Sequence, residues 1–330
     1  MMFQYRHLSR HARVFEHLTG LRLSEFDELS AALVPVQEAT HRDALARREK
    51  PRRRAVGGGG QFCLGHRDQL LLTVIWLRRY PTHETLGYVF GVDATTVGRI
   101  LSRVVPLLAQ SGRDTMKMPD PGRKRRASLD VLLTQTPELA VIVDSFEQRV
   151  QRPRSPRNKA GSDSGSDLGS GSKPAKDSHY SGKKKQHTLK SQVSVDEDTG
   201  QIVEVSPSVP GPTADLRLLQ ESQVLQRLPE GVGVLGDLAY LGLHKEHPQG
   251  LGATPRRKPR GRDRPEEDKA FNRAFARRRI QVEHSIGRLR RYDSLNQMDR
   301  HHRQNHTDRV VAVAGLVNRQ IQARHPHRFA

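Results

Sequence analysis

Three acidic residues that lie far apart in the chain are the side chains best suited to chemistry. Asp144 and Asp237 each end a short apolar run, at 139–143 and 232–236, and Glu283 lies on a long predicted helix. In open α/β sheets, functional groups gather where strands end, so we expect these acids to meet. Three hard carboxylates suit Mg²⁺ or Mn²⁺. Two such ions, about 3.5–4 Å apart, would activate the attacking oxygen and stabilise the leaving oxygen of a phosphodiester.

The helix that carries Glu283 also places two cations beside it. At about 100° per residue, Arg279, Glu283 and Arg290 fall on one strip next to an apolar stripe. The alternative interpretation is an ordinary ion pair between residues four apart on a solvated helix, worth only about 0.2–0.5 kcal/mol. The functional interpretation depends on the full set of three acids in a strongly basic chain.

Composition points to a polyanionic partner. The 330 residues include 56 Lys and Arg against 36 Asp and Glu, a formal net charge of +20. Such a charge favours nucleic acid, because Lys and Arg gain by releasing phosphate counterions. Only 35% of the residues are hydrophobic, so part of the length is expected to be linker or tail.

The same composition excludes several classes of protein. No run of about 18 apolar residues predicts a membrane span, and the polar, basic segment from Met1 to Arg13 does not resemble a secretory signal. The single cysteine, Cys63, excludes an internal disulfide framework and a zinc site built on several thiolates. We interpret it as a small buried hydrophobe. A cytoplasmic protein bound to nucleic acid is therefore expected.

Residues 1–112 are predicted to be helical. Residues 1–60 comprise a helical region, with Ser24 as a candidate N-cap, and a Gly-rich linker at its end. Residues 61–112 predict a helix-turn-helix, because one helix ends before Pro81, Thr82 caps a second through Phe90, and Asp93 caps a third from Ala94 to about Leu108. The polar side of the third helix could contact DNA or could merely be solvated; its residues are Thr95, Thr96, Arg99 and Arg103.

The remainder of the chain is predicted to be an α/β domain. A basic linker at 113–137 contains Arg123–Arg126, which either connects the domains or contacts phosphates. The catalytic domain is assigned to 138–323, with a disordered Gly/Ser-rich insert at about 154–178, and 324–330 form a tail. Its expected elements are a hairpin of 187–195 and 202–205, a helix capped by Thr213, a strand at 232–236, a helix from 265 to about 291 and a last helix at 307–323.

Several other polar residues have two interpretations. Lys183, Lys184 and Lys185 could contact the DNA backbone or could protect an exposed strand edge. The histidines at 301, 302 and 306 could bind a metal, but phosphate contact or a solvated loop is favoured because no thiolates or acids adjoin them. His284 points to another helix face than Glu283 and is expected to be structural.

Four motifs in a fixed order resemble a known family. They are Val143-Asp144-Ser145-Phe146-Glu147 with Gln151-Arg152-Pro153, Tyr180–Lys190 with its Gly-Lys-Lys-Lys-Gln-His-Thr core, Leu235-Gly236-Asp237-Leu238-Ala239-Tyr240, and Arg279–Arg290 with Val-Glu-His-Ser-Ile-Gly-Arg. As a set, they resemble the bacterial insertion-sequence transposases of the DDE class, in particular the insertion-sequence-five family, whose endonuclease domain is related to that of the Harbinger elements. The resemblance covers roughly 66–320.

The resemblance implies an α/β (α+β) architecture: an RNase H-like mixed-sheet catalytic domain preceded by an all-α helix-turn-helix domain. It implies that Asp144, Asp237 and Glu283 hold two Mg²⁺ (or Mn²⁺) ions. Water would cut the phosphodiester at the element end, and the freed 3′-hydroxyl would attack target DNA. Arg279 and Arg290 would hold phosphate or orient Glu283. Ala276, where related groups often carry Tyr, and the long segment after Arg154 depart from the family pattern.

The expected protein is thus a DDE transposase and endonuclease that acts on double-stranded DNA, both terminal inverted repeats and target, as a dimer on DNA. Its expected location is the bacterial cytoplasm, associated with the nucleoid and not with a membrane. Two alternatives remain open at this point: a non-catalytic DNA-binding regulator derived from a transposase, and a nuclease without strand transfer.

Overall fold

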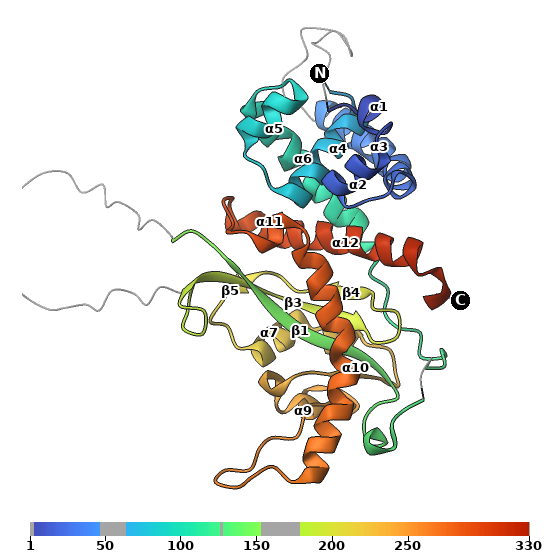
Figure 1. The fold of residues 1–330 in the computed structure, drawn as a ribbon, viewed down its shortest axis with the longest axis vertical. Coiled ribbons are helices and arrows are strands. Elements are labelled where there is room, and N and C mark those ends of the chain that lie inside the picture. Colours follow the sequence, from blue (N-terminus) through green and yellow to red (C-terminus); the bar gives the residue numbers. More distant parts are fainter. Residues whose placement is uncertain (1–2, 47–63, 126–127, 153–178, 330) are drawn as a thin grey trace, which may run out of the picture.

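The computed structural model describes residues 3–46, 64–125, 128–152 and 179–329 (Figure 1). Cys63, Arg126 and the predicted insert at 154–178 lie outside these ranges. The N-terminal helices gather at one end of the molecule, and the sheet with its covering helices forms the other. None of the helices in the described ranges is both long and apolar enough to cross a lipid bilayer.

The N-terminal region is helical, as predicted. It contains α1 (Tyr5–Leu8), α2 (Ala12–Thr19) and α3 (Leu23–Ala46). The predicted N-cap at Ser24 is wrong, because α3 already begins at Leu23. Glu25 provides the cap interaction instead, with its Oε2 accepting the Arg22 N–H at 2.8 Å. A Glu three residues after the capping position satisfies a helix-start N–H in the same way as in a capping box.

The helix-turn-helix unit forms with the predicted caps. Its helices are α4 (His66–Arg79), α5 (His83–Phe90) and α6 (Ala94–Arg113). Thr82 accepts the Thr85 N–H at 3.2 Å, and Asp93 accepts the Thr96 N–H at 2.8 Å. Gly91 supplies the left-handed turn between α5 and α6, with φ of 71°. The third helix is longer than predicted because α6 continues to pack beyond Leu108, with Ala109 and Gly112 buried.

One mixed sheet forms the centre of the C-terminal region. Its strand order is β2-β3-β1-β6-β7, and β4 and β5 also pair with β3. β3 is antiparallel to β1 and β4, whereas β6 is parallel to both β1 and β7. The strands are β1 (Leu139–Arg149), β2 (Tyr180–Ser181), β3 (Gln186–Asp196), β4 (Ile202–Val205), β5 (Val209–Pro210), β6 (Val232–Leu235) and β7 (Gly252–Ala253). This arrangement confirms the predicted RNase H-like mixed-sheet class.

Helices cover both faces of the sheet. Alternate β1 side chains point to opposite faces: Ile142 joins the large apolar cluster with Phe275 and Val282, and Val143 joins a second cluster with Tyr240. The first cluster includes α10 (Glu266–Arg290), α11 (Asp293–Asn296) and α12 (His306–Arg324). The second cluster lies under α7 (Asp215–Ser222), α8 (Val224–Arg227) and α9 (Leu243–Glu246).

Two local predictions in this domain need correction. β1 does not end before Asp144 but continues to Arg149, because β3 pairs with it along that whole length. Only the parallel partner stops early, at Ile142 opposite Leu235. Thr213 does not cap α7, since its hydroxyl donates to the Pro210 carbonyl at 2.7 Å and Ala214 occupies the capping position.

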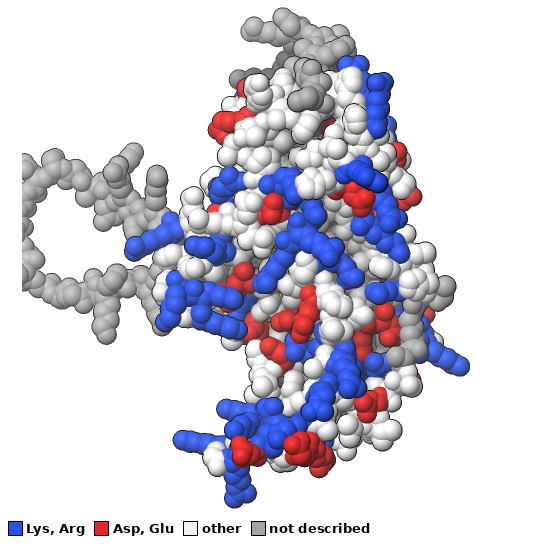
Figure 2. Space-filling view, viewed as in Figure 1, with Lys and Arg blue, Asp and Glu red and all other residues white. Residues whose placement is uncertain are grey.

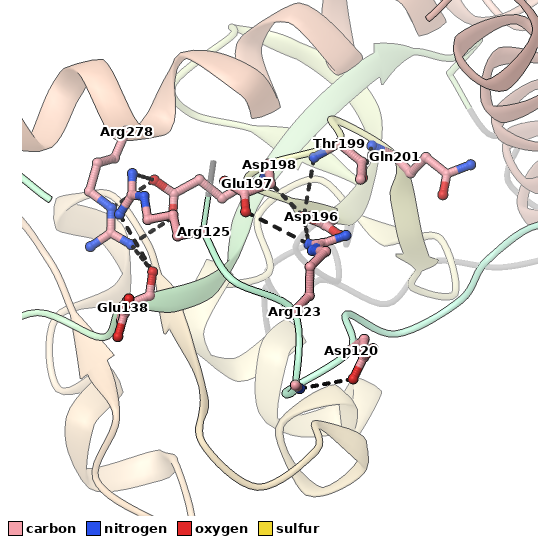
Figure 3. A network of polar contacts seen from close by, with 11 residues as sticks. Asp120, Arg123, Arg125, Glu138, Asp196, Glu197, Asp198, Thr199, Gln201 and Arg278 are labelled. Atoms are coloured by element: carbon pink, nitrogen blue, oxygen red, sulfur yellow. Dashed lines mark hydrogen bonds and ion pairs between the residues drawn. The ribbon is translucent and has the colours of Figure 1, made fainter. Parts of the chain in front are cut away.

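The basic linker packs on one end of the sheet rather than extending as an arm. Arg123 donates to both carboxylate oxygens of Asp196 at 2.9 and 2.8 Å. Glu197 accepts from Arg125 at 2.7 Å and from the buried Arg278 of α10 at 2.7 and 2.6 Å (Figure 3). Arg123 and Arg125 are therefore neutralised by acids within the protein, so the alternative of phosphate contact by this segment does not hold for these two residues.

Two glycines allow the N-terminal helices to join the C-terminal α/β domain closely. A Cβ on Gly112 of α6 would lie 2.7 Å from the Val311 carbonyl oxygen of α12, and a Cβ on Gly315 would overlap the Gly112 backbone. Real Cβ atoms do not approach backbone atoms this closely, so α6 and α12 cross at a distance that only glycine permits.

Replacing Gly315 with Ala should therefore separate these helices. We expect Gly315→Ala to destabilise the protein by about 1–3 kcal/mol through overpacking, measured by urea unfolding. Gly287→Ala is the control, because Gly287 is also inside a helix but an added Cβ there would meet no atom within 4 Å. It should leave stability unchanged or raise it by up to about 1 kcal/mol. Equal stability of the two variants would contradict the close crossing.

Candidate active site

The pairing register brings Asp144 and Asp237 together. β1 and β6 run in parallel with Val141 opposite Val234 and Ile142 opposite Leu235. Asp237 follows Leu235 by two residues, as Asp144 follows Ile142, so the chain after β6 continues beside β1 at Asp144. Each carboxylate accepts a nearby backbone N–H at 2.8 Å, Asp144 from Ser145 and Asp237 from Ala239. These bonds fix the direction of both acids.

Helix α10 adds a guanidinium to this pair. Arg279 Nη2 lies 3.7 Å from Asp144 Oδ2, and the two side chains are 13% and 24% exposed. Arg279 Nε is buried and has no hydrogen-bond partner in the part of the chain that the structure describes. Arg279 therefore retains donor capacity beside the acids.

Burial and neighbouring carboxylates both disfavour the ionised form of Asp144. Burial raises its pKa to about 6, and the charges of Asp237 and Asp215 add to the rise, whereas the Ser145 N–H and Arg279 oppose it. Burial and the same three carboxylates also raise the pKa of the Tyr240 hydroxyl. Tyr240 donates to Gln192 Oε1 at 3.1 Å, so it stays protonated as a structural donor behind the acids.

Sequence reasoning missed Asp215. This residue opens α7, where its Oδ1 accepts the Ser145 hydroxyl at 2.6 Å and lies 3.1 Å from Lys190 Nζ. The only sequence signal was an acid at a helix start, which is the common position for a residue that complements the helix dipole. Its proximity to Ser145 depends on a contact between residues 70 apart in sequence.

Glu283 and Arg290 lie on the predicted strip of α10, and both are exposed. The alternative ion pair between Arg279 and Glu283 does not form, because Arg279 points to Asp144 instead. Within the described ranges, no group of three or more His, Cys, Asp or Glu side chains is arranged to hold a metal. The structure thus brings Asp144 and Asp237 together and leaves Glu283 on the adjoining helix surface.

The donor set fits a divalent cation. Asp144 and Asp237 offer hard oxygen ligands, their mutual repulsion contributes to the raised pKa of Asp144, and Arg279 at 3.7 Å is the cation paired with Asp144. A bound cation would favour the ionised form of both acids. Two neighbouring carboxylates are hard, negatively charged ligands, which suit Mg²⁺ or Mn²⁺ better than a soft metal.

The predicted DNA-contact residues are accessible. On α6, Thr95, Arg99 and Arg103 are exposed, whereas the Thr96 hydroxyl donates to Asp93 at 2.7 Å and so serves the helix cap. Lys183, Lys184 and Lys185 are exposed in the turn between β2 and β3. In Figure 2, Lys and Arg side chains surround a central acidic area on the face that carries α10.

The histidine cluster does not form a metal site in the described ranges. His306 is buried and uses both ring nitrogens, Nδ1 with the Ser208 hydroxyl at 2.7 Å and Nε2 with Gln148 Oε1 at 2.8 Å. His301 stacks on His83 with ring centroids 5.1 Å apart. Both histidines are therefore engaged in packing between elements, rather than in a solvated loop or in phosphate contact.

Comparison with known proteins matches two segments of this chain to family models. The family described as DDE superfamily endonuclease matches residues 143–318, and the helix-turn-helix of DDE superfamily endonuclease matches residues 62–114. A relative named as a probable transposase for insertion sequence element IS702, from Microchaete diplosiphon, is 27% identical over 310 residues, which are 94% of this chain and 95% of the relative.

Two solved structures show a weaker likeness. The Mos1 transposase paired-end complex with left transposon end is 14% identical, with a TM-score of 0.21 over 63% of this chain and 61% of that chain. The pre-cleavage Mos1 transpososome is 13% identical, with a TM-score of 0.23 over 74% and 81%. At these TM-scores the likeness carries no argument about this chain.

The raised pKa of Asp144 has a consequence for stability without metal. The folded-state pKa of Asp144 is about 6, above the ordinary 3.8, so the folded protein favours the protonated carboxyl more than the unfolded chain does. The free energy of unfolding that this preference adds is fully present below about pH 4 and is lost as the pH rises through 6. Asp144→Asn removes the charge, and in a chelator it should raise the free energy of unfolding by about 1–3 kcal/mol at pH 8 and leave it unchanged at pH 4. Urea unfolding at both pH values measures this.

The matched control is Asp263→Asn, since the Asp263 side chain is fully exposed and should show no such difference. An equal effect of Asp144→Asn at both pH values would contradict the proposed environment of this carboxylate.

Proposed function

This chain belongs to the DDE superfamily endonucleases, and on that premise we propose that it is a DNA transposase. It would cut phosphodiester bonds at the ends of an insertion element and transfer the freed strand into target DNA. The observation that carries this proposal is the pairing of Asp144 with Asp237 beside β6, with Arg279 3.7 Å from Asp144. The match to a probable transposase along 94% of the chain supports it.

The proposed catalytic residues are Asp144, Asp237 and Glu283. Asp144 and Asp237 would hold two Mg²⁺ or Mn²⁺ ions with Glu283, which lies one helical turn after Arg279 on the same strip of α10. When bound, such ions activate the attacking oxygen and stabilise the leaving oxygen. Because Glu283 is exposed and has no ion-pair partner in the described chain, its side chain is free to turn toward the aspartates.

Arg279 has the proposed role of binding the phosphate that is cut. Its guanidinium is partly desolvated and has an unused Nε donor, and a planar fork of donors matches phosphate oxygens. Arg290 would contact the backbone two turns beyond Glu283. Burial of Asp144 and Arg279 limits competing water around the reacting phosphate, which strengthens these charge interactions.

The DNA partner would be held at two further surfaces. The exposed side of α6 would read the terminal inverted repeat, through Thr95, Arg99 and Arg103, with Thr96 at its cap. Lys183, Lys184 and Lys185 would contact phosphates near the site. We propose a homodimer on DNA, so that two element ends can be joined, and a location in the bacterial cytoplasm at the nucleoid.

One assay separates the transposase from its alternatives. Purified protein, a fragment with the element end and a supercoiled plasmid are incubated with Mg²⁺. The proposal expects insertion products; nicked plasmid alone would indicate a nuclease without strand transfer, and binding alone would indicate a regulator. The element end is found as an inverted repeat in the DNA that flanks the reading frame.

Removing the charge of any one proposed catalytic acid should abolish cleavage. We expect Asp144→Asn, Asp237→Asn and Glu283→Gln each to reduce the cleavage rate by at least about 100-fold, because a ligand of the ions is lost. Binding to the element-end duplex should remain within about twofold. Glu230→Gln, at an exposed glutamate before β6, is the control and should cleave normally. Unchanged cleavage by one of the three variants would remove that residue from the site.

A further inference from the structure

The loop between β7 and α10 is a concentrated source of positive charge. Residues 255–264 contain six Arg or Lys and one Asp. Arg257, Lys258, Arg260 and Arg262 are exposed. Lys258 pairs with Asp263 at 3.5 Å. The other three have no ion-pair partner within the described ranges. Figure 2 shows this charge at the bottom of the molecule.

The loop is fixed to α10 at its first arginine. The Arg256 N–H donates to Asn272 Oδ1 at 2.7 Å, and Asn272 Nδ2 donates back to the Arg256 carbonyl at 3.0 Å. The Arg256 guanidinium lies 4.4 Å from the Phe271 ring centroid and pairs with Asp268 at 3.0 Å and Glu267 at 3.3 Å. Arg256 thus neutralises acids at the start of α10, and the exposed cations that follow project from a defined point.

The position of this anchor relates the loop to the candidate active site. Asn272 lies seven residues before Arg279, which is two helical turns or about 10 Å along the same side of α10. The loop and the helix-turn-helix lie at opposite ends of the molecule, and β1, the strand that carries Asp144, lies between them (Figure 1). DNA bound by α6 and cut beside Asp144 would therefore continue toward the loop.

We propose that loop 255–264 binds the phosphate backbone of the duplex that flanks the element end, on the far side of the cut bond from the repeat held by α6. This inference rests on the proposed function. The contact is electrostatic, because the exposed groups are flexible cations without a shaped apolar surface. It contributes affinity that does not depend on the flank sequence but does depend on salt.

The test compares two duplexes: the element end alone, and the same end extended by about 20 base pairs of arbitrary flank. Arg257→Gln/Arg260→Gln should bind the first duplex like the unmodified protein. On the second it should lose about tenfold in affinity, and the slope of log affinity against log salt should fall by about 1–2. The matched control is Arg217→Gln/Lys245→Gln, which removes two exposed cations from α7 and α9 and should bind both duplexes normally.

The outcomes separate this inference from the proposed function. An affinity gain from the flank that the loop variant retains would overturn the inference, as would a protein that gains nothing from the flank. Failure of the unmodified protein to prefer the element end over random duplex would overturn the proposed function instead. Unchanged thermal unfolding of both variants establishes that the loop change did not disturb the fold.

A separate observation concerns the backbone at Asp144. β6 supports β1 only as far as Ile142, so the segment with Asp144 and Ser145 pairs along one edge alone, with β3. Ser145 links two acids there: its N–H donates to Asp144 Oδ1 at 2.8 Å, and its hydroxyl donates to Asp215 Oδ1 at 2.6 Å. Asp215 is held in turn by the buried Lys190, whose ammonium lies 3.1 Å away and donates to the Thr213 carbonyl at 2.6 Å.

From these contacts we infer that Asp215 is a positioning residue, which fixes Asp144 through Ser145 where the parallel strand pairing has ended. A partner that orients a metal ligand typically changes metal affinity or activity by about 10–100-fold when removed. We expect Asp215→Ala and Ser145→Ala each to raise the Mg²⁺ concentration that gives half-maximal thermal stabilisation by about tenfold, and to slow cleavage similarly. The double variant should be no worse than either single variant, because both remove the same link.

The same strand offers a matched control. Glu147 is two residues from Ser145 on the same face of β1, and the Thr188 hydroxyl donates to Glu147 Oε2 at 2.6 Å. Glu147→Ala and Thr188→Ala remove an equivalent contact farther from Asp144 and should leave the Mg²⁺ dependence unchanged. Ser145→Thr keeps a hydroxyl and should show the Mg²⁺ dependence of the unmodified protein. Additive losses at Ser145 and Asp215, or equal losses in the control pair, would overturn the positioning role; unaltered cleavage by all catalytic-acid variants would instead overturn the proposed function.

Discussion

The parallel ladder between β1 and β6 is the constraint on which the site depends. It places Leu235 opposite Ile142 and then stops, so that two aspartates leave the ladder side by side where the sheet no longer buries their charges fully. Three neighbouring elements support this end of the ladder. β3 pairs with the other edge of β1, α10 places Arg279 at one face of the strand, and α7 places Asp215 at the other. The repulsion between neighbouring carboxylates is maintained because the rest of the domain holds the strands in place.

The large positive charge of the chain is divided between two uses. Some cations work inside the protein: Arg278 and Arg125 neutralise Glu197, and Arg123 neutralises Asp196. Such buried pairs specify how segments dock rather than attract a partner. Others stay exposed on α6, on the turn before β3 and on the loop before α10. Net charge therefore indicates a polyanion partner correctly, but only the structure separates the cations that can meet DNA from those already paired.

Local signals in the sequence predicted most elements that position the site. The caps at Thr82 and Asp93, the hairpin around 196–200 and the start of α10 after Pro265 all form as expected, because each depends on a few adjacent residues. The errors share a different origin. The extension of β1 past Asp144, the docking of Arg123 and the contact of Asp215 with Ser145 depend on partners tens of residues away. Helical periodicity placed Glu283 on the correct strip but could not indicate that Arg279 would prefer Asp144 to it.

The glycine contact between Gly112 and Gly315 has a consequence for how DNA length is measured. Since α6 and α12 meet backbone to backbone, the helix proposed to read the repeat and the last helix of the catalytic domain cannot slide independently. The distance between a base bound by α6 and the bond that we propose is cut beside Asp144 would then be fixed by the protein. An element whose repeat drifted by a few base pairs would present the wrong phosphate, and selection would act on spacing as strictly as on sequence.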